Sequence, residues 1–380
     1  MKKIILFVVL FCVFGFNVNA QTFEFNVNEK DNLYNEIYEI YVNDDLENNI
    51  PDDVKSLLDS LEIENTNPIS INNLLSKQGL DNIKNYFSNK IKLPIKSLSL
   101  LITTIIICAF CSAFSSNNLG AKKSLNYICV ASVVLIFIYQ ITSLINSTIT
   151  IVNTLNTIML SFIPIFAGIL IAALKSGVSV SFSSTMFFVC ETISAVSSKV
   201  ILPFSNCFIA LSVAGCLSPT SRISGITRMI KKAAYIILSF LMAIFLAFLS
   251  VQSTISNSVD NTMTKTAKFF ISSFVPIIGP TLSETLGSFR SCISLLKSTI
   301  SIYVVIVIIL VVLPKIIEII MFKFVFTLCS EISDMYDIVQ IKMILDAFNQ
   351  ALSLILAVVL CVCLMFVFSI TIISIAGNSL

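Results

Sequence analysis

The sequence predicts an all-α fold, a polytopic bundle of about seven to nine transmembrane helices with a small N-terminal extracytoplasmic helical segment. Two properties of the whole chain indicate a membrane protein: 56% of its residues are hydrophobic and only 12% are charged, whereas soluble domains carry about 25% charged residues. The mean hydropathy of +0.93 agrees. A water-soluble fold of 380 residues could not bury so much apolar surface, so the chain is expected to act in or across a membrane.

Apolar runs place the predicted spans, because a helix needs roughly 20 uncharged residues to cross about 30 Å of hydrocarbon. Six runs have this length: 97–116, 125–145, 157–174, 232–251, 299–322 and 350–374. The three weaker stretches are 182–198, 200–217 and 268–287. Counting all of them gives nine crossings. Leaving out 182–198 and 268–287, which Glu, Pro or Gly interrupts, gives seven.

Residues 1–20 are typical of a signal peptide. Lys2 and Lys3 precede an apolar core, and small side chains at Val18 and Ala20 follow it in the pattern of a cleavage site. An uncleaved membrane anchor is the alternative, although the apolar core is short for a span. In either case the segment that follows is expected to lie outside the cytoplasm.

The two remaining parts of the chain differ in charge. Residues 21–95 carry 14 acidic and 6 basic residues, a net charge of −8, whereas 96–380 carry 8 acidic and 16 basic residues, a net charge of +8. This difference predicts an extracytoplasmic acidic segment over 21–95 and a multi-pass, permease-like membrane domain over 96–380. Within the acidic segment, Pro51-Asp52-Asp53 is typical of a helix start.

Basic residues orient the predicted spans, because Lys and Arg in short loops are retained on the cytoplasmic side. Lys122, Lys123 and the basic loop 218–232 are therefore expected in the cytoplasm. The uncharged stretch 146–156 is expected to be an external loop between two crossings. The resulting count of crossings places the C-terminus in the cytoplasm.

A short internal echo favours a repeat within the membrane domain. Ser161-Phe-Ile-Pro-Ile165 recurs as Ser273-Phe-Val-Pro-Ile277, and both units follow a Lys-Lys pair and a span that begins near a Tyr. Because both units start on the same side, a parallel repeat of about four spans per unit is predicted rather than an inverted one.

Absent motifs argue against enzyme chemistry. The chain contains no His, which removes the commonest general base and the commonest zinc ligand. It also has no GxxxxGK[ST] motif, so it carries no P-loop of its own. None of the 11 Cys residues lies in 21–95, and Cys within apolar spans behaves as a small hydrophobe. The chain is therefore predicted not to be an enzyme and to bind no metal or cofactor.

Charges within the predicted spans are candidates for function, because each costs about 2.5–3.5 kcal/mol at a helix centre unless it has a partner or an aqueous cavity. Glu191 lies in the middle of a predicted span, where a pathway role and a structural contact between helices are equally consistent. Lys315 and Glu318 are three residues apart and are expected to form a local pair.

The segment 260–297 is a candidate functional centre. Pro276, Gly279 and Pro280 weaken or remove backbone hydrogen bonds, which indicates a broken or re-entrant helix, with a plain kinked span as the alternative. Glu284 would need a cation or water there. The nearest cations along the sequence are Lys268, Arg290 and Lys297.

The basic loop combines two features. Isoleucines at 223, 226 and 230 fall on one helical face, and positive charges surround them. These charges are Arg222, Arg228, Lys231 and Lys232. The pattern favours an interfacial helix lying on anionic lipid. Docking of a cytoplasmic ATPase is the alternative.

The stretch from 251 to 297 resembles the signature of the stage III sporulation protein AE family. The resemblance rests on Val251-Gln252, Asp260, Lys265-Thr-Ala-Lys-Phe269, Phe274-Val-Pro-Ile-Ile-Gly279, Ser283-Glu284 and Leu295-Leu-Lys297. The order of leader, extracytoplasmic segment and membrane domain is also similar. Two positions depart from the pattern, Ser253 in place of Gly and Lys265 in place of Arg. The resemblance adds Asp260 and Ser283 to the candidate site residues.

This resemblance implies a mother-cell membrane component of a channel or secretion complex that joins mother cell and forespore and is required for spore development. The implied partners are ring-forming extracytoplasmic proteins, a cytoplasmic secretion-type ATPase and membrane lipid; a homo-oligomer is possible, and nucleic acid is not expected. Segment 21–95 would then face the forespore. Two alternatives stay open: a structural anchor for ring proteins without its own pathway, and a stand-alone secondary transporter or ABC-type permease.

Overall fold

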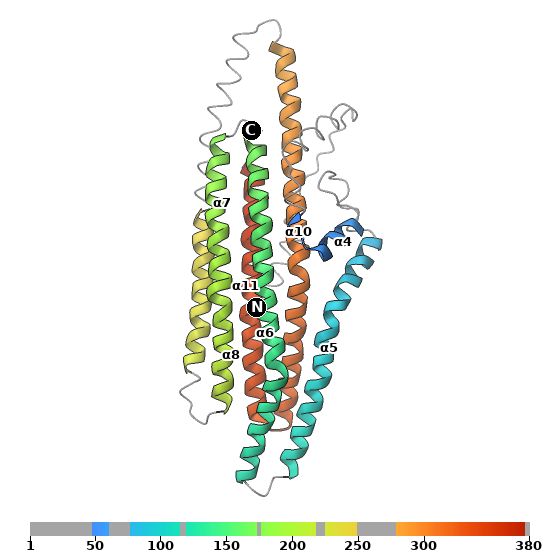
Figure 1. Ribbon diagram of the computed structural model, residues 1–380, viewed down its shortest axis with the longest axis vertical. Coiled ribbons are helices and arrows are strands. Elements are labelled where there is room, and N and C mark those ends of the chain that lie inside the picture. The colour runs from blue at the N-terminus through green and yellow to red at the C-terminus, as the bar shows by residue number, and fades with distance from the viewer. Residues whose placement is uncertain are drawn as a thin grey trace.

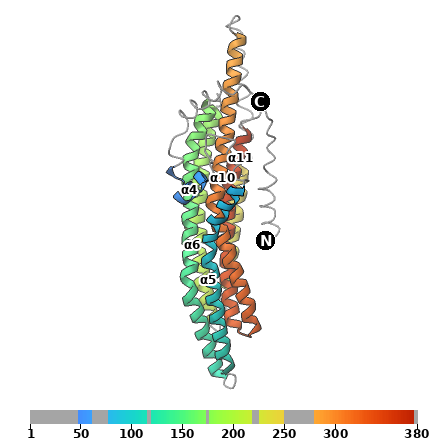
Figure 2. The same ribbon diagram turned by 90° about the vertical axis from the view of Figure 1, so that its right-hand side faces the viewer.

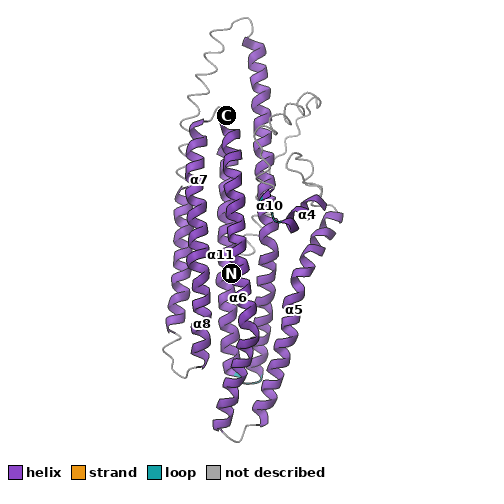
Figure 3. Cartoon of the chain, in the orientation of Figure 1, coloured by secondary structure: helices purple, strands orange, loops and turns teal. Residues whose placement is uncertain are grey.

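The computed structural model describes residues 48–60, 77–114, 119–172, 176–217, 225–248 and 279–376, and every regular element in these ranges is helical (Figures 1 and 3). The predicted all-α fold is confirmed. The helices are α4 (Asp52–Ser60), α5 (Lys77–Phe114), α6 (Leu119–Ala172), α7 (Ser176–Val196), the π-helical turn η2 (Ser197–Ile201), α8 (Leu202–Leu217), an unlabelled helix (Gly225–Phe248), α10 (Gly279–Met335) and α11 (Val339–Ala376).

Six helical rods in the described part of the chain are long and apolar enough to cross a membrane. They run along the long axis of one elongated bundle, with α5 on one side and the helix Gly225–Phe248 on the other (Figure 1). The apolar part of α6, Tyr127–Ala172, has 46 residues and is about 69 Å long, more than twice the thickness of the hydrocarbon layer. Part of the bundle therefore lies outside the hydrocarbon.

The predicted external loop 146–156 is wrong, because these residues lie inside the continuous helix α6. Hydroxyl groups explain why so polar a stretch stays helical. Thr150 Oγ1 donates to the carbonyl oxygen of Asn146 at 3.2 Å, and Thr157 Oγ1 donates to that of Asn153 at 3.1 Å. Each hydroxyl is thus satisfied by its own helix, and neither water nor a turn is required.

The two crossings predicted over 182–198 and 200–217 are also wrong. Helices α7 and α8 run in one direction and are joined only by the turn η2, so they form a single rod. The described residues thus contain six rods where seven to nine crossings were predicted. The predicted repeat of about four spans per unit does not fit this count, because two rods and not four crossings lie between Lys122 and Lys231. Its second motif, 273–277, lies outside the described residues, so the repeat stays a prediction.

The six rods alternate in direction, which changes the predicted position of the C-terminal end. Helix α5 begins and α11 ends at the same, upper end of the bundle in Figure 1. The ends of α5 and α6, of α8 and Gly225–Phe248, and of α10 and α11 meet at the lower end. The end of the chain is therefore expected on the same side of the membrane as the start of α5, and not opposite to it.

A reporter that is active only outside the cytoplasm tests this arrangement. Fusions after residues 90, 258 and 380 should behave alike and be active, and a fusion after 226 should be silent. The expected signals follow from the basic residues at the lower end of the bundle, Lys122, Lys123, Arg228, Lys231 and Lys232, which we expect to be retained in the cytoplasm. A silent fusion at 380 together with an active one at 90 would require an odd number of crossings and would contradict the six-rod arrangement.

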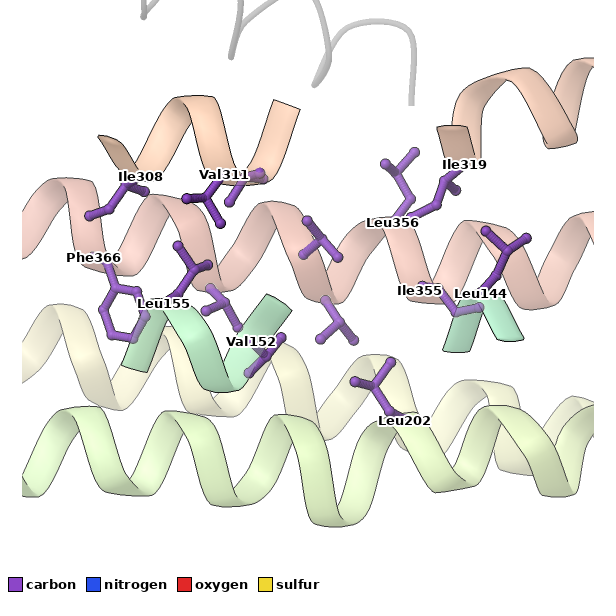
Figure 4. Close-up of a cluster of buried hydrophobic side chains, with 14 of the residues drawn as sticks. Leu144, Val152, Leu155, Leu202, Ile308, Val311, Ile319, Ile355, Leu356 and Phe366 are labelled. Atoms are coloured by element: carbon purple, nitrogen blue, oxygen red, sulfur yellow. The ribbon is translucent and has the colours of Figure 1, made fainter. Parts of the chain in front are cut away.

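Helix α11 lies in the middle of the bundle and packs against α6, α8 and α10. Buried side chains from these four helices interlock around it in the close-up (Figure 4): Leu144, Val152 and Leu155 of α6, Leu202 of α8, Ile308, Val311 and Ile319 of α10, and Ile355, Leu356 and Phe366 of α11. The helix start predicted at Pro51 is confirmed, since α4 begins at Asp52. Val54, Leu57 and Leu58 of α4 are buried as it packs on α5 and α10.

Candidate functional site

A ladder of polar side chains joins the lower halves of α10 and α11. Its four rungs are Asp334–Lys342 at 2.6 Å, Ser330–Asp346 at 2.7 Å, Thr327–Asn349 at 2.8 Å and Lys323–Ser353. Ser330 and Lys323 donate to their partners in α11, and the amide nitrogen of Asn349 donates to Thr327 Oγ1. The rungs lie between two helices whose other facing residues are mainly apolar.

Helix geometry produces this ladder from sequence spacing. Steps of three or four residues keep the polar side chains on one face of each helix. Counted away from the turn, the polar residues of α10 are 334, 330, 327 and 323, and those of α11 are 342, 346, 349 and 353. The two series have the same spacing, so a single register of the antiparallel hairpin forms all four rungs. The turn sets that register: Asp337 adopts φ 59°, and the backbone N–H of Ile338 donates to the carbonyl oxygen of Ser333 at 3.0 Å.

A third helix meets the ladder from the side. Lys231, near the start of the helix Gly225–Phe248, donates to the side-chain carbonyl oxygen of Gln350 at 3.0 Å. The ladder and this contact gather three cations, Lys231, Lys323 and Lys342, on neighbouring helices. The two carboxylates Asp334 and Asp346 lie among them and offset part of their charge.

Near the middle of α10, a buried cation links that helix to α6. Lys315 is 4% exposed, and its Nζ donates to Glu318 Oε2 at 2.8 Å and to the hydroxyl of Ser147. The predicted local pair of Lys315 and Glu318 is confirmed. The contact with Ser147 was not predicted, because Ser147 belongs to the stretch that had been assigned to a loop.

A second buried cation lies higher in α10. Lys297 is 4% exposed, and its Nζ lies 5.8 Å from the centre of the Phe166 ring of α6. The negative face of an aromatic ring attracts a cation at this distance. Lys297 and Lys315 are 18 residues apart, so about 27 Å of helix separates them. The apolar residues of α10 between them, such as Val304 and Ile308, are buried in the bundle.

The structure does not bring the other predicted pathway residues together with these cations. Glu191 is an exposed residue of α7, and it takes part in neither ion pair seen among the described residues. Asp260, Lys268 and Pro276 lie outside the described residues.

Of the broken or re-entrant helix predicted over 268–287, only 279–287 belong to the described residues, so it stays a prediction. Gly279 and Pro280 are the first residues of α10, which continues without interruption to Met335. Pro suits the first turn because its missing N–H has no partner in that position anyway. The first turns of α10, which contain Ser283 and Glu284, extend beyond the upper ends of the neighbouring helices in both views (Figures 1 and 2). These first turns therefore lie at one end of the bundle and not at its centre.

The predicted interfacial helix over 218–232 is replaced by the start of a longer one. The helix Gly225–Phe248 contains Arg228, Lys231 and Lys232 in its first turns, with Arg228 and Lys232 exposed. Arg222 lies outside the described residues. The basic side chains thus mark the lower end of a membrane-length rod, where cations reach the lipid headgroups.

Sequence reasoning missed most of the ladder. Lys323, which directly follows the predicted span 299–322, is not among the predicted site residues. The available signal was the matching spacing of polar residues in 323–334 and 342–353. Among the described residues, no group of three His, Cys, Asp or Glu could hold a metal ion, and all the Cys residues described are free thiols.

These features define a polytopic helical membrane protein that carries charged and polar side chains inside its bundle. A family model described as stage III sporulation protein AE matches residues 53–377, and the chain belongs to this family. The resemblance found in 251–297 is thereby confirmed. The chain is 22% identical over 301 residues to stage III sporulation protein AE of Bacillus subtilis (strain 168), a match that covers 78% of this chain and 75% of that protein. No solved structure matches the chain.

Proposed function

We propose that this chain is a membrane subunit of a transport or channel complex that links mother cell and forespore and is required for spore development. Membership of the stage III sporulation protein AE family supports the role in sporulation. The observation that carries the transport role is the row of cations along α10: Lys297 and Lys315 are buried, and Lys323 is partly buried. Intramembrane charges are costly and mark substrate or ion pathways by default.

The two ends of the bundle supply the surroundings for such a complex. The lower end carries Lys122, Lys123, Arg228 and Lys232, which favour a position in the cytoplasm against anionic lipid. A secretion-type ATPase would meet the protein on this side. Ring-forming extracytoplasmic proteins would meet the other end, from which the first turns of α10 extend (Figure 2). No enzymatic step is part of this proposal.

Neutralising Lys323 tests the transport role. Lys323→Met removes the cation of the Lys323–Ser353 rung, and a side chain of similar length keeps the packing. We therefore expect the number of heat-resistant spores to fall on the order of tenfold or more. Lys96→Met is the matched control, because Lys96 is an exposed cation of α5 at a similar level of the bundle. Its neighbour Ser97 donates a hydrogen bond to Gln140 of α6 at 3.0 Å. Phe137, about one turn from Gln140, packs against Phe326 of α10, which is close to Lys323. Immunoblots of membranes check that both proteins accumulate normally.

Two results would contradict the proposal. Parental spore counts in Lys323→Met would show that the cation serves packing alone, in agreement with a structural anchor. Equal losses in Lys323→Met and Lys96→Met would show that any charge at this level matters, whatever its position in the bundle.

A further inference from the structure

The outward face of α6 changes character along its length. Its exposed residues are apolar near the lower end, where Ile128, Leu135 and Tyr139 are 61%, 75% and 79% exposed. Toward the upper end, Ile171 is again an exposed apolar residue, at 53%. Between these ends five successive exposed residues are polar, namely Ser143, Asn146, Thr150, Asn153 and Thr157, and the next exposed residue is Pro164. We call these five residues the α6 seam.

The α6 seam has the spacing of a helix-pairing surface. Its residues follow one another in alternating steps of three and four, which is the 3.5-residue repeat of a left-handed coiled coil. Ser and Thr are small, so they allow two helix backbones to approach closely within a membrane. An ordinary lipid-facing helix surface needs neither property.

The seam lies at membrane depth and not at an end of the bundle. Ser147, next to Asn146, bonds Lys315 of α10, and Asn153 accepts a hydrogen bond from Ser194 of α7 at 3.4 Å. The helices that make these contacts are long enough to cross a membrane, and their most apolar 18-residue windows have mean hydropathies of 2.4 in Tyr127–Ala172, 2.9 in Leu296–Met335 and 1.6 in Ser179–Cys216. Lipid is therefore the expected neighbour of any exposed residue at this level.

Lipid cannot satisfy the two carboxamides of the seam. The hydroxyls of Thr150 and Thr157 bond carbonyl oxygens of their own helix, so these side chains tolerate lipid. Asn146 makes no side-chain hydrogen bond within the described part of the chain, and Asn153 uses only its carbonyl oxygen there. An amide left without partners in hydrocarbon costs several kcal/mol. A polar surface must therefore cover the seam.

We propose that the seam binds the α6 seam of a second copy of this chain, in a parallel two-fold dimer. A carboxamide both donates and accepts, so the same residue of the second copy is a complete partner for it. Copies inserted in one direction are related by an axis along the membrane normal, which places each α6 parallel to the other and each seam residue opposite itself. Asn146 and Asn153, seven residues apart, then form two successive layers of amide pairs.

Cysteine cross-linking in native membranes tests the contact. In Thr150→Cys, mild oxidation is expected to give a covalent dimer on a non-reducing gel. Thr103→Cys is the matched control, because Thr103 is an exposed residue of α5 and does not belong to the α6 seam. Its hydroxyl donates to the Ser99 carbonyl oxygen at 2.9 Å, as the Thr150 hydroxyl does to that of Asn146. This variant and the parent, which contains 11 native Cys residues, should stay monomeric on the same gel.

A second variant tests the role of the amides. Asn146→Leu combined with Asn153→Leu should weaken self-association about tenfold for each amide removed, measured as energy transfer between labelled copies diluted into vesicles. Thermal unfolding of Asn146→Leu alone in detergent should match the parent, because Asn146 is exposed and its side chain bonds no other helix in the described part of the chain.

Three outcomes would overturn the dimer. Thr150→Cys could stay monomeric and react with a membrane-impermeant maleimide, which would make the seam the wall of an aqueous path. It could instead form an adduct with a different protein. Unchanged energy transfer in the double Leu variant would remove the amides from the contact. The inference does not depend on the proposed transport role, since self-association is measured without sporulation.

Discussion

Lys315→Met is expected to destabilise the protein by about 2–3 kcal/mol and to abolish spore formation. Removing one partner of a buried ion pair leaves the other charge without compensation, which costs about 3–5 kcal/mol in deep interiors. Glu318 is 20% exposed, so water screens part of its charge, and we expect a value below that range. Thermal unfolding of the purified protein in detergent measures the change, and counts of heat-resistant spores measure function.

A double variant separates stability from function at the same position. Lys315→Met combined with Glu318→Met removes both charges and keeps the side-chain volume, so most of the lost stability should return. Spore formation should not return if the cation serves a pathway. A double variant that sporulates like the parent would assign the pair to packing alone. A single Lys315→Met variant as stable as the parent would contradict the burial of the pair.

Phe326→Ala is expected to lower the stability of the bundle by about 2 kcal/mol. The Phe326 ring is fully buried and lies 5.8 Å from both Phe137 of α6 and Phe348 of α11, so it joins three helices. In a membrane the unfolded helices keep their apolar side chains in lipid, so the transfer contribution is small. The cavity contribution remains, at about 24 cal/mol per Å³ for a volume on the order of 100 Å³.

Phe324→Ala is the matched control for this prediction. Phe324 lies two residues away on the same helix and is 55% exposed. Its removal opens no cavity, so the unfolding temperature should stay close to that of the parent. Equal destabilisation by the two substitutions would contradict the packing of α10 between α6 and α11.

The candidate site could be predicted from the sequence only where its residues are close together in the chain. Lys315 and Glu318 are one helical turn apart, so their pairing follows from helix geometry alone. Lys323 and Ser353 are 30 residues apart, and their contact depends on the register of the α10–α11 hairpin, which the turn at Asp337 sets. The matching spacing of polar residues in 323–334 and 342–353 fits that register, but only the folded chain shows which residues pair.

The sequence by itself determined the class of this protein and the family to which it belongs. Its apolar content excludes a water-soluble fold, and long runs without charge form helices because every backbone group in lipid must be bonded within its own segment. The family pattern in 251–297 is likewise a local property of the chain. Neither depends on how the helices pack against each other.

Only the tertiary structure decided whether the polar stretch 146–156 is a loop or part of a helix. Ser, Thr and Asn side chains can bond water outside the membrane or partners inside it, and the sequence is the same in both cases. In the fold, Ser147 meets Lys315 and Asn153 meets Ser194, so neighbouring helices supply the partners that water would supply in a loop. The number of rods among the described residues and the position of the α6 seam likewise follow from the tertiary structure.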